Sequence, residues 1–380
     1  MNWGYIVLAY LSLFALGIGD NVRGPLFPEI LKEFAVTDAQ GAQFFALSSF
    51  LGFLGSYGVR FFLLKLHRVH TLQVALLLMT VGLIGMGSVA QFSWLLFFSA
   101  IFGLSLGIIG VVQNVLVTVG SLPHRRQRLL SGLHATYGIS SFLAPLLVAT
   151  ITSWAGSWRY VFWSVAVVPF FLMFGAFFKK NENEKSSVSI EKFSIKETGL
   201  EHAAQIYLGF SLGLYVLAEI LISSRLALFI RRELGLGLQD SSYYLTGFFV
   251  GLLLGRGLFA LVHFNFSLRR MLSVSLVLSV FCIIGGLVLH PFFLILSGAT
   301  MAPFYPLAVS YIHQHFESRI DSAVSSAMAI QSLLTVLMHI GVGYLTDIFG
   351  IAKAMWVGPL ALVLSFLVLN SFERIFRKKV

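Results

Sequence analysis

Twelve apolar runs, each long enough for a helix to cross a bilayer, follow one another along the 380 residues of the chain. A helix needs about 20 apolar residues to cross a hydrocarbon core of roughly 30 Å. The runs are 3–24, 38–60, 70–90, 93–119, 129–153, 157–178, 202–230, 239–262, 267–288, 291–314, 319–344 and 350–370. Because a helix satisfies its main-chain hydrogen bonds within one segment, these runs predict an all-α membrane protein with 12 transmembrane helices. The first run lacks a basic start and eleven more follow it, so we expect a retained span rather than a cleaved signal peptide.

Composition excludes several other classes of protein. Hydrophobic residues make up 57% of the chain and charged residues 11%, against roughly a quarter charged in soluble domains. A soluble enzyme, a nucleic-acid-binding protein and a disordered protein are therefore excluded. The single cysteine, Cys282, excludes a disulfide framework and a metal site built on cysteines.

Lysine and arginine in the loops predict the orientation of the spans. If both termini lie in the cytoplasm, 18 basic residues fall on the inner side and 5 on the outer side. Cytoplasmic loops carry the excess of basic residues in membrane proteins. We therefore expect a multi-pass protein of the cell (inner) membrane with both termini inside, and the net charge of +10 has the same origin.

The only long polar stretch, 179–200, divides the twelve runs into six and six. It predicts an N-terminal six-helix half at 1–178, a cytoplasmic linker at 179–200 and a C-terminal six-helix half at 201–380. The halves resemble each other weakly. Asp20 lies 17 residues after Trp3, Glu219 lies 17 residues after His202, and each acid is followed by an arginine, Arg23 or Arg225. These echoes indicate an internal repeat.

Five short motifs stand in the apolar runs: LYVLAE at 214–219, GR at 255–256, GLHATYGISSFLAPLL at 132–147, ALGIGDN at 15–21 and APFYPLA at 302–308. They resemble motifs of the major facilitator superfamily, and within it those of the fucose and glucose/galactose permeases. The fourth run keeps Asn114 of the fucose-type motif but lacks its glutamate, and the loop after the second run lacks the superfamily's aspartate. The resemblance implies two pseudosymmetric six-helix halves, alternating access and sugar–proton symport.

Asp20 is the first candidate for proton coupling. It lies about 25 Å along the helix from the start of its run, at 1.5 Å per residue, which places it in the outer third. Arg23 is three residues on, close enough to pair with it. The two interpretations are a carboxylate that accepts a proton from outside and a static ion pair that closes an outer gate. The neighbouring Asn21 either binds a hydroxylated solute or caps this pair.

Glu219 is the leading proton-coupling candidate, because its helix offers no basic residue within one turn. A buried acid without a cation can load and release protons; a structural hydrogen bond is the alternative. Arg225, six residues on, either serves a gate or extends to the interface. Arg256 lies toward the cytoplasmic side behind two glycines and is expected to close an inner gate, and Arg60 occupies a similar depth in the second run.

Amides, imidazoles and aromatic rings in the runs suit a sugar, which needs donors, acceptors and an apolar surface. The further substrate-binding candidates are Gln113, Asn114, His134, Tyr137, Tyr215, Gln331 and His339. Gln331 is expected near mid-depth, whereas His134 and Tyr137 are expected nearer the inner face, where they could serve the gate. For each residue the alternative is a structural hydrogen bond between helices.

The chain carries no HExxH, GxSxG or nucleotide-binding GxxxxGK[ST] motif. We therefore expect no enzyme activity and no cofactor, and transport driven by an ion or solute gradient. The prediction is proton-coupled uptake of a small hydroxylated solute by a monomer in the lipid bilayer, with no nucleic-acid partner. The alternatives are proton-antiport export of drug-like or amphipathic molecules, a membrane enzyme, and a sensor without turnover.

Overall fold

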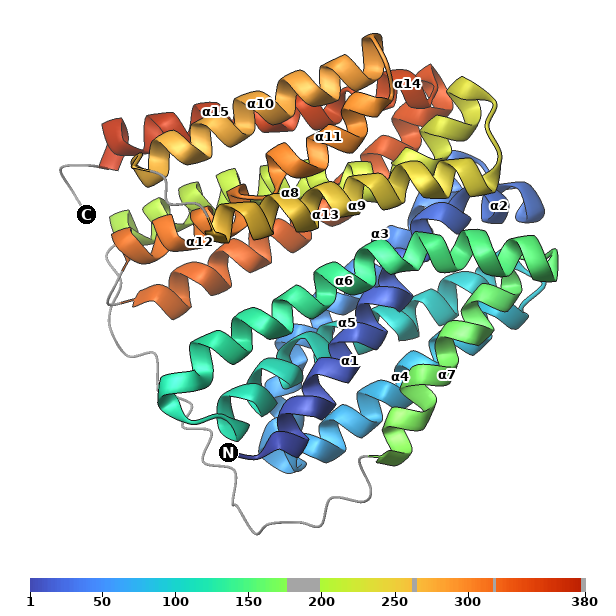
Figure 1. Ribbon diagram of the computed structural model, residues 1–380, viewed down its shortest axis with the longest axis horizontal. Coiled ribbons are helices and arrows are strands. Elements are labelled where there is room, and N and C mark those ends of the chain that lie inside the picture. Colours follow the sequence, from blue (N-terminus) through green and yellow to red (C-terminus); the bar gives the residue numbers. More distant parts are fainter. Residues whose placement is uncertain (176–198, 262–264, 317–318, 377–380) are drawn as a thin grey trace. The chain divides into compact units, whose positions relative to one another are not determined.

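The computed structural model describes residues 1–175, 199–261, 265–316 and 319–376, and every regular element in these ranges is a helix (Figure 1). The earlier helices are α1 (Trp3–Asn21), α2 (Arg23–Phe34), α3 (Asp38–Lys65), α4 (Arg68–Ser88), α5 (Phe92–Gly120), α6 (Pro123–Ala155) and α7 (Arg159–Gly175). The later helices are α8 (Gly199–Leu234), α9 (Leu238–Leu261), α10 (Leu268–Val288), α11 (Phe292–Met301), α12 (Phe304–His315), α13 (Ile320–Phe349), α14 (Ile351–Ala354) and α15 (Val357–Phe376).

These helices make twelve spans. In the described ranges, ten stretches are long and apolar enough to cross a membrane, and three of them join consecutive helices: α1 with α2, α11 with α12, and α14 with α15. The apolar α7 and the 24-residue α9 take the sixth and eighth places in the order. The predicted all-α membrane protein with twelve spans is confirmed.

The first span is longer than its apolar run. It continues from Trp3 to Phe34, 32 residues, because Arg23 is buried and the two prolines of α2 do not end the helix. Asp20 is therefore 17 residues from one end and 14 from the other. The expectation that Asp20 lies in the outer third is wrong: it lies near the middle of its span.

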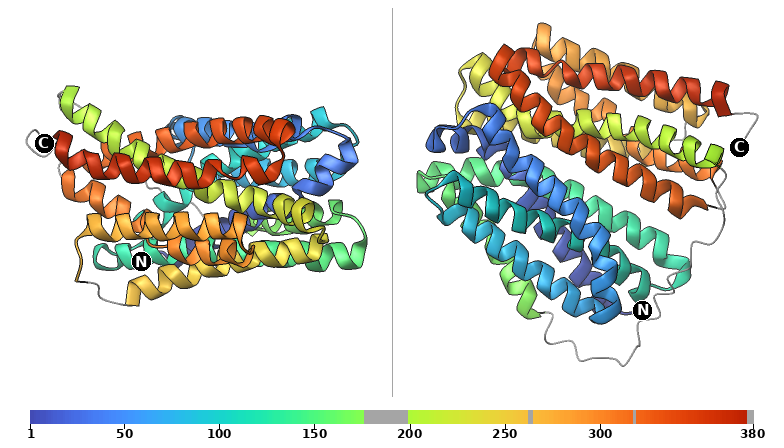
Figure 2. Two further views of the ribbon diagram at one scale, coloured as in Figure 1. Left: turned by 90° about the horizontal axis from the view of Figure 1, so that it is seen from above. Right: turned by 180° about the vertical axis from the view of Figure 1, so that it is seen from behind.

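The described residues form two compact units. Unit 1 comprises the described parts of Met1–Val36 and Gln43–Lys192, and unit 2 those of Thr37–Ala42 and Phe193–Val380. In unit 1, α4 packs on α5 and α7, and α1 packs on α5 and α6. In unit 2, α8 packs on α13 and α15, and α11 packs on α9 and α10 (Figures 1 and 2). The predicted linker lies outside the described residues except for its last two, which begin α8.

Glycines bring helix backbones together at matching places in the two units. In unit 1, a Cβ on Gly107 of α5 would lie 1.9 Å from the Gly52 carbonyl oxygen of α3. In unit 2, a Cβ on Gly298 of α11 would lie 2.1 Å from the Phe248 carbonyl oxygen of α9. These are the second and fourth spans of each six-span set, so both units use small residues for the same close helix contact.

Unit 2 also contains the first turn of α3. The Asp347 carboxylate of α13 accepts hydrogen bonds from the main-chain N–H groups of Asp38, at 2.7 Å, and Ala39, at 3.0 Å. The Asp38 side chain in turn pairs with Arg232 of α8 at 2.7 Å. A carboxylate at a helix N-terminus satisfies donors that have no partner within the helix, so Asp347 caps α3.

Candidate functional site

Each unit holds a half-buried acid beside an arginine and a tyrosine near the middle of its helices. In unit 1 the acid is Asp20, and the predicted ion pair with Arg23 is present, from Arg23 Nη2 to Asp20 Oδ1. The side chain of Arg23 is 6% exposed and that of Asp20 is 29% exposed. Arg23 also donates to Ser48 Oγ on α3 at 2.6 Å.

Aromatic rings enclose the Arg23 guanidinium. Its Cζ atom lies 5.7 Å from the ring centre of Phe44, 5.3 Å from that of Phe45 and 5.0 Å from that of Phe102. Rings at these distances attract a cation through their negative faces. The arginine is therefore held by a carboxylate, a hydroxyl and three rings, and little of it is open to water.

Tyr137 of α6 and Asn21 complete the cluster in unit 1. The Tyr137 hydroxyl donates to Asp20 Oδ2 at 3.1 Å. The Asn21 amide donates to the Gly17 carbonyl at 2.8 Å and to Ser141 Oγ at 3.1 Å. The expectation that Tyr137 lies nearer the inner face is wrong: α6 begins at Pro123, before its apolar run, so Tyr137 reaches the level of Asp20.

In unit 2 the acid is Glu219 of α8. The Tyr215 hydroxyl lies 2.6 Å from Glu219 Oε2, and Arg256 Nη2 of α9 lies 3.5 Å from Glu219 Oε1. The premise that no cation accompanies Glu219 is wrong, because the neighbouring helix supplies one. The Arg256 side chain is 37% exposed and that of Glu219 is 22% exposed, so the arginine of this pair is more open than that of unit 1, whereas the acid is slightly less so.

Tyr215 is fully buried, at 0% exposure. Its ring stacks on Phe304, the first residue of α12, with ring centres 4.3 Å apart. Its hydroxyl also lies 2.8 Å from the main-chain carbonyl oxygen of Met301, the last residue of α11. Tyr215 therefore contacts both Glu219 and the break that separates α11 from α12.

The other candidates lie apart from these clusters. Gln113 is buried on α5, where its Oε1 has no hydrogen-bond partner among the described residues. The neighbouring Asn114 donates to the Gly110 carbonyl at 2.7 Å. On α13, Gln331 Oε1 is buried without a partner among the described residues, and His339 is buried at 2% exposure.

Three further candidates have different surroundings. Arg225 is 1% exposed, so the interpretation that it extends to the membrane interface is wrong. His134 is exposed on α6. The side chain of Arg60 lies outside the described residues.

The contacts that sequence reasoning missed are Ser48, Ser141, the three phenylalanines around Arg23 and the Met301 carbonyl. Serine is common in apolar runs, the rings are three among 37 phenylalanines, and a main-chain oxygen leaves no mark in a sequence. A search for local spacing could not have found them, because most of their partners come from other helices.

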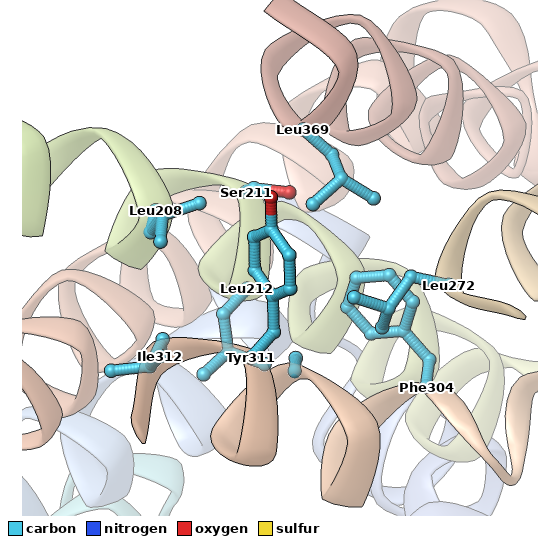
Figure 3. A pocket seen from close by; sticks show the side chains of 9 residues that line it. Leu208, Ser211, Leu212, Leu272, Phe304, Tyr311, Ile312 and Leu369 are labelled. Atoms are coloured by element: carbon cyan, nitrogen blue, oxygen red, sulfur yellow. The ribbon is translucent and has the colours of Figure 1, made fainter. Parts of the chain in front are cut away.

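A small pocket lies in unit 2 between α8, α10, α12 and α15, with the Tyr311 ring among its lining side chains (Figure 3). Its cavity volume of ≈ 10 Å³ is close to the space that one water molecule needs, so it does not hold a solute. No group of three or more His, Cys, Asp or Glu side chains in the described parts of the chain could hold a metal ion.

Several solved structures are similar to this chain over nearly its whole length. A bacterial homologue of the human lysosomal transporter Spinster shares 16% identity and a TM-score of 0.77, over 99% of this chain and 97% of that one. A D-xylose–proton symporter shares 14% identity and a TM-score of 0.81, over 97% of each chain. The peptide transporter POT, solved with sulfate, shares 15% identity and a TM-score of 0.77, over 98% of this chain and 95% of that one.

At these identities the structures show a common fold. No curated protein sequence matches the chain. The family model described as the Major Facilitator Superfamily matches residues 9–319. The chain therefore belongs to the major facilitator superfamily, a family of multi-pass membrane transporters, and is a transporter rather than an enzyme.

Proposed function

We propose that this chain takes up a small hydroxylated solute, such as a sugar, together with protons, by alternating access of its two six-helix halves. Membership of the superfamily supports secondary transport. The LYVLAE, GR and APFYPLA motifs resemble those of the fucose and glucose/galactose permeases, and a D-xylose–proton symporter shares the fold.

The observation that carries the proposal is the difference in exposure between the arginines that pair with the two half-buried acids. Protonation of Asp20 would leave the enclosed, 6% exposed Arg23 without its counter-charge, which is costly in a low-dielectric site. Protonation of Glu219 would leave Arg256, which is 37% exposed and can be solvated. Glu219 is therefore the proton carrier of this proposal, and the Asp20–Arg23 pair holds its cluster in place.

Amide side chains supply the proposed contacts with the solute. Gln113 and Gln331 each present a buried oxygen without a partner among the described residues, and an amide can both donate to and accept from a sugar hydroxyl. Unpaired polar atoms in apolar surroundings are costly, so a bound hydroxyl that pairs with them gains affinity. Asn114 and Asn21, whose amide N–H groups already bond to protein oxygens, would offer their carbonyl oxygens.

The proposal also covers the membrane location, the orientation and the oligomeric state of the protein. The excess of basic residues in alternate loops supports a location in the inner membrane with both termini in the cytoplasm. A monomer suffices, since each chain would contain both halves and both acids.

Uptake into liposomes of purified protein tests this function. A thermal-shift screen of sugars, polyols and organic acids first identifies a solute, because a ligand that binds the folded state raises its melting temperature. An acidic exterior should then drive that solute into the vesicles. Accumulation driven by an acidic lumen would instead establish proton antiport, the exporter alternative, and would contradict symport.

A further inference from the structure

The Tyr215 hydroxyl lies between two oxygen atoms at hydrogen-bonding distance. Glu219 Oε2 is 2.6 Å away and the Met301 carbonyl oxygen is 2.8 Å away; both distances are typical of O–H···O bonds. A tyrosine hydroxyl has one hydrogen to donate. The carbonyl has none, so the single hydroxyl hydrogen has two competing acceptors, and a protonated Glu219 carboxyl would free it for the Met301 carbonyl.

The contact between Glu219 and Arg256 is long for an ion pair. A guanidinium and an ionised carboxylate usually approach to 2.7–2.9 Å, whereas Arg256 Nη2 and Glu219 Oε1 are 3.5 Å apart. The Asp20–Arg23 contact in unit 1 is much closer. If Glu219 carries a proton in this arrangement, it donates to the Tyr215 oxygen, and Tyr215 donates to the Met301 carbonyl.

The Met301 carbonyl lies where the helix is interrupted, so a side-chain hydrogen bond to it can stabilise the interruption. α11 ends at Met301 and α12 begins at Phe304, with Pro303 between them. Proline has no N–H and interrupts the hydrogen bonds of a helix. Because the Tyr215 ring is buried and stacked on Phe304, its hydroxyl hydrogen can rotate between the two acceptors while the ring stays in place.

We propose that Tyr215 is a positioning residue that transmits the protonation state of Glu219 to the break between α11 and α12. With Glu219 protonated, the hydroxyl donates to the Met301 carbonyl and stabilises the break. With Glu219 ionised, the hydroxyl donates to the carboxylate, since that bond is charge-assisted, and the Met301 carbonyl loses this donor. The inference rests on the proposed role of Glu219 as proton carrier.

The titratable and charged groups that face Glu219 are few. Tyr215 lies on the same helix, Arg256 comes from α9, and Tyr305 comes from α12. His339 of α13 is a further buried titratable side chain in unit 2. A pH response that is absent from Glu219→Gln but present in His339→Gln therefore assigns the titration to Glu219.

Hydrogen exchange at the break tests the inference without measuring transport. Amide exchange over residues 299–308 is followed by mass spectrometry as a function of pH, in intact purified protein and corrected for intrinsic rates. In the wild type, protection should be about fivefold higher at low pH, the size of one hydrogen bond. Glu219→Gln, whose amide can donate to the tyrosine oxygen, should be protected at every pH.

Tyr215→Phe keeps the stacked ring and removes the hydroxyl, so its protection should be low at every pH. The matched control is Tyr207→Phe on the same helix, whose hydroxyl bonds to Ser371 Oγ instead; it should keep the pH response of the wild type. A Tyr215→Phe protein that retains the wild-type pH response at 299–308 would overturn the inference.

The two proposals can fail separately. If Glu219→Gln loses proton-driven uptake while Tyr215→Phe keeps the pH response, the inference is wrong and the proposed function stands. If Glu219→Gln still concentrates the solute, the proposed carrier is wrong, whatever the exchange experiment shows. If amide exchange over residues 299–308 does not depend on pH in the wild type, Tyr215 does not transmit the protonation state of Glu219, and the inference is wrong.

Discussion

The surroundings of an arginine decide how readily the carboxylate beside it can lose its charge. Arg23 is enclosed by three rings and a serine hydroxyl, so Asp20 is its main counter-charge. The side chain of Arg256 is more than a third exposed. Water can therefore stabilise its charge when Glu219 is neutral. Neutralisation of Asp20 and neutralisation of Glu219 are therefore expected to have different effects on the stability of the protein.

Asp20→Asn should destabilise the protein more than Glu219→Gln. Removal of one partner of a buried ion pair costs about 3 kcal/mol at the lower end of the usual range, which fits the 29% exposure of Asp20. The Glu219→Gln change should cost less, because the Arg256 that it leaves without a counter-charge is 37% exposed and can be solvated. Equilibrium unfolding in mixed micelles measures both, and the double variant Asp20→Asn with Arg23→Gln should recover part of the loss. Equal destabilisation by the two single changes would contradict the difference in enclosure.

The pairs differ in how far the sequence could predict them. Asp20 and Arg23 are three residues apart on one polypeptide segment, so their contact followed from helix geometry alone. Glu219 and Arg256 are 37 residues apart and meet through the packing of α8 on α9, which one sequence does not specify. The depth of Asp20 was misjudged for another reason: hydropathy marked where the run ended, whereas the helix continues through a buried arginine and two prolines.

At the scale of helices, small residues set how closely neighbouring spans approach. Gly103 and Gly107 of α5 lie against Ser48 and Gly52 of α3, where even a Cβ would overlap main-chain atoms. In a membrane, where apolar burial contributes little to helix association, such close packing is a main source of stability. The face of α5 that carries Gly107 is therefore more constrained than the face that carries Gly110.

Gly107→Ala should destabilise unit 1, whereas Gly110→Ala should not. The new Cβ of Gly107→Ala would lie 1.9 Å from a carbonyl oxygen, and nothing lies within 4 Å of a Cβ at Gly110. Overpacking of this kind costs about 1–3 kcal/mol. Thermal unfolding in detergent compares the two variants, which differ by less than one helical turn in position. Equal melting temperatures would show that α3 and α5 do not approach as closely as described.

At the scale of the whole molecule, hydropathy predicted the number and type of spans because the bilayer restricts what a chain can form. Apolar stretches of this length have one stable structure in lipid, the helix, and no tertiary contact had to be known. The three breaks, between α1 and α2, between α11 and α12 and between α14 and α15, were not predicted, since each lies within a single predicted run.

The orientation remains a prediction that labelling can check. In a Cys282→Ser background, His124→Cys and Arg270→Cys should resist a membrane-impermeant maleimide added to intact cells, because the basic first turns of α6 and α10 that contain them are expected inside. Glu233→Cys, which is exposed in the last turn of α8 on the expected outer side, should react. The reverse pattern would show that the termini lie outside the cytoplasm.

The most direct test of the account is solute accumulation driven by a pH gradient in liposomes that contain wild-type protein, Glu219→Gln or Asp20→Asn. With one proton per solute, a gradient of one pH unit should concentrate the solute about tenfold in the wild type. Glu219→Gln should still exchange labelled for unlabelled solute but should not concentrate it, because an amide cannot carry a proton. Full accumulation by Glu219→Gln together with its loss in Asp20→Asn would make Asp20 the carrier and contradict the account.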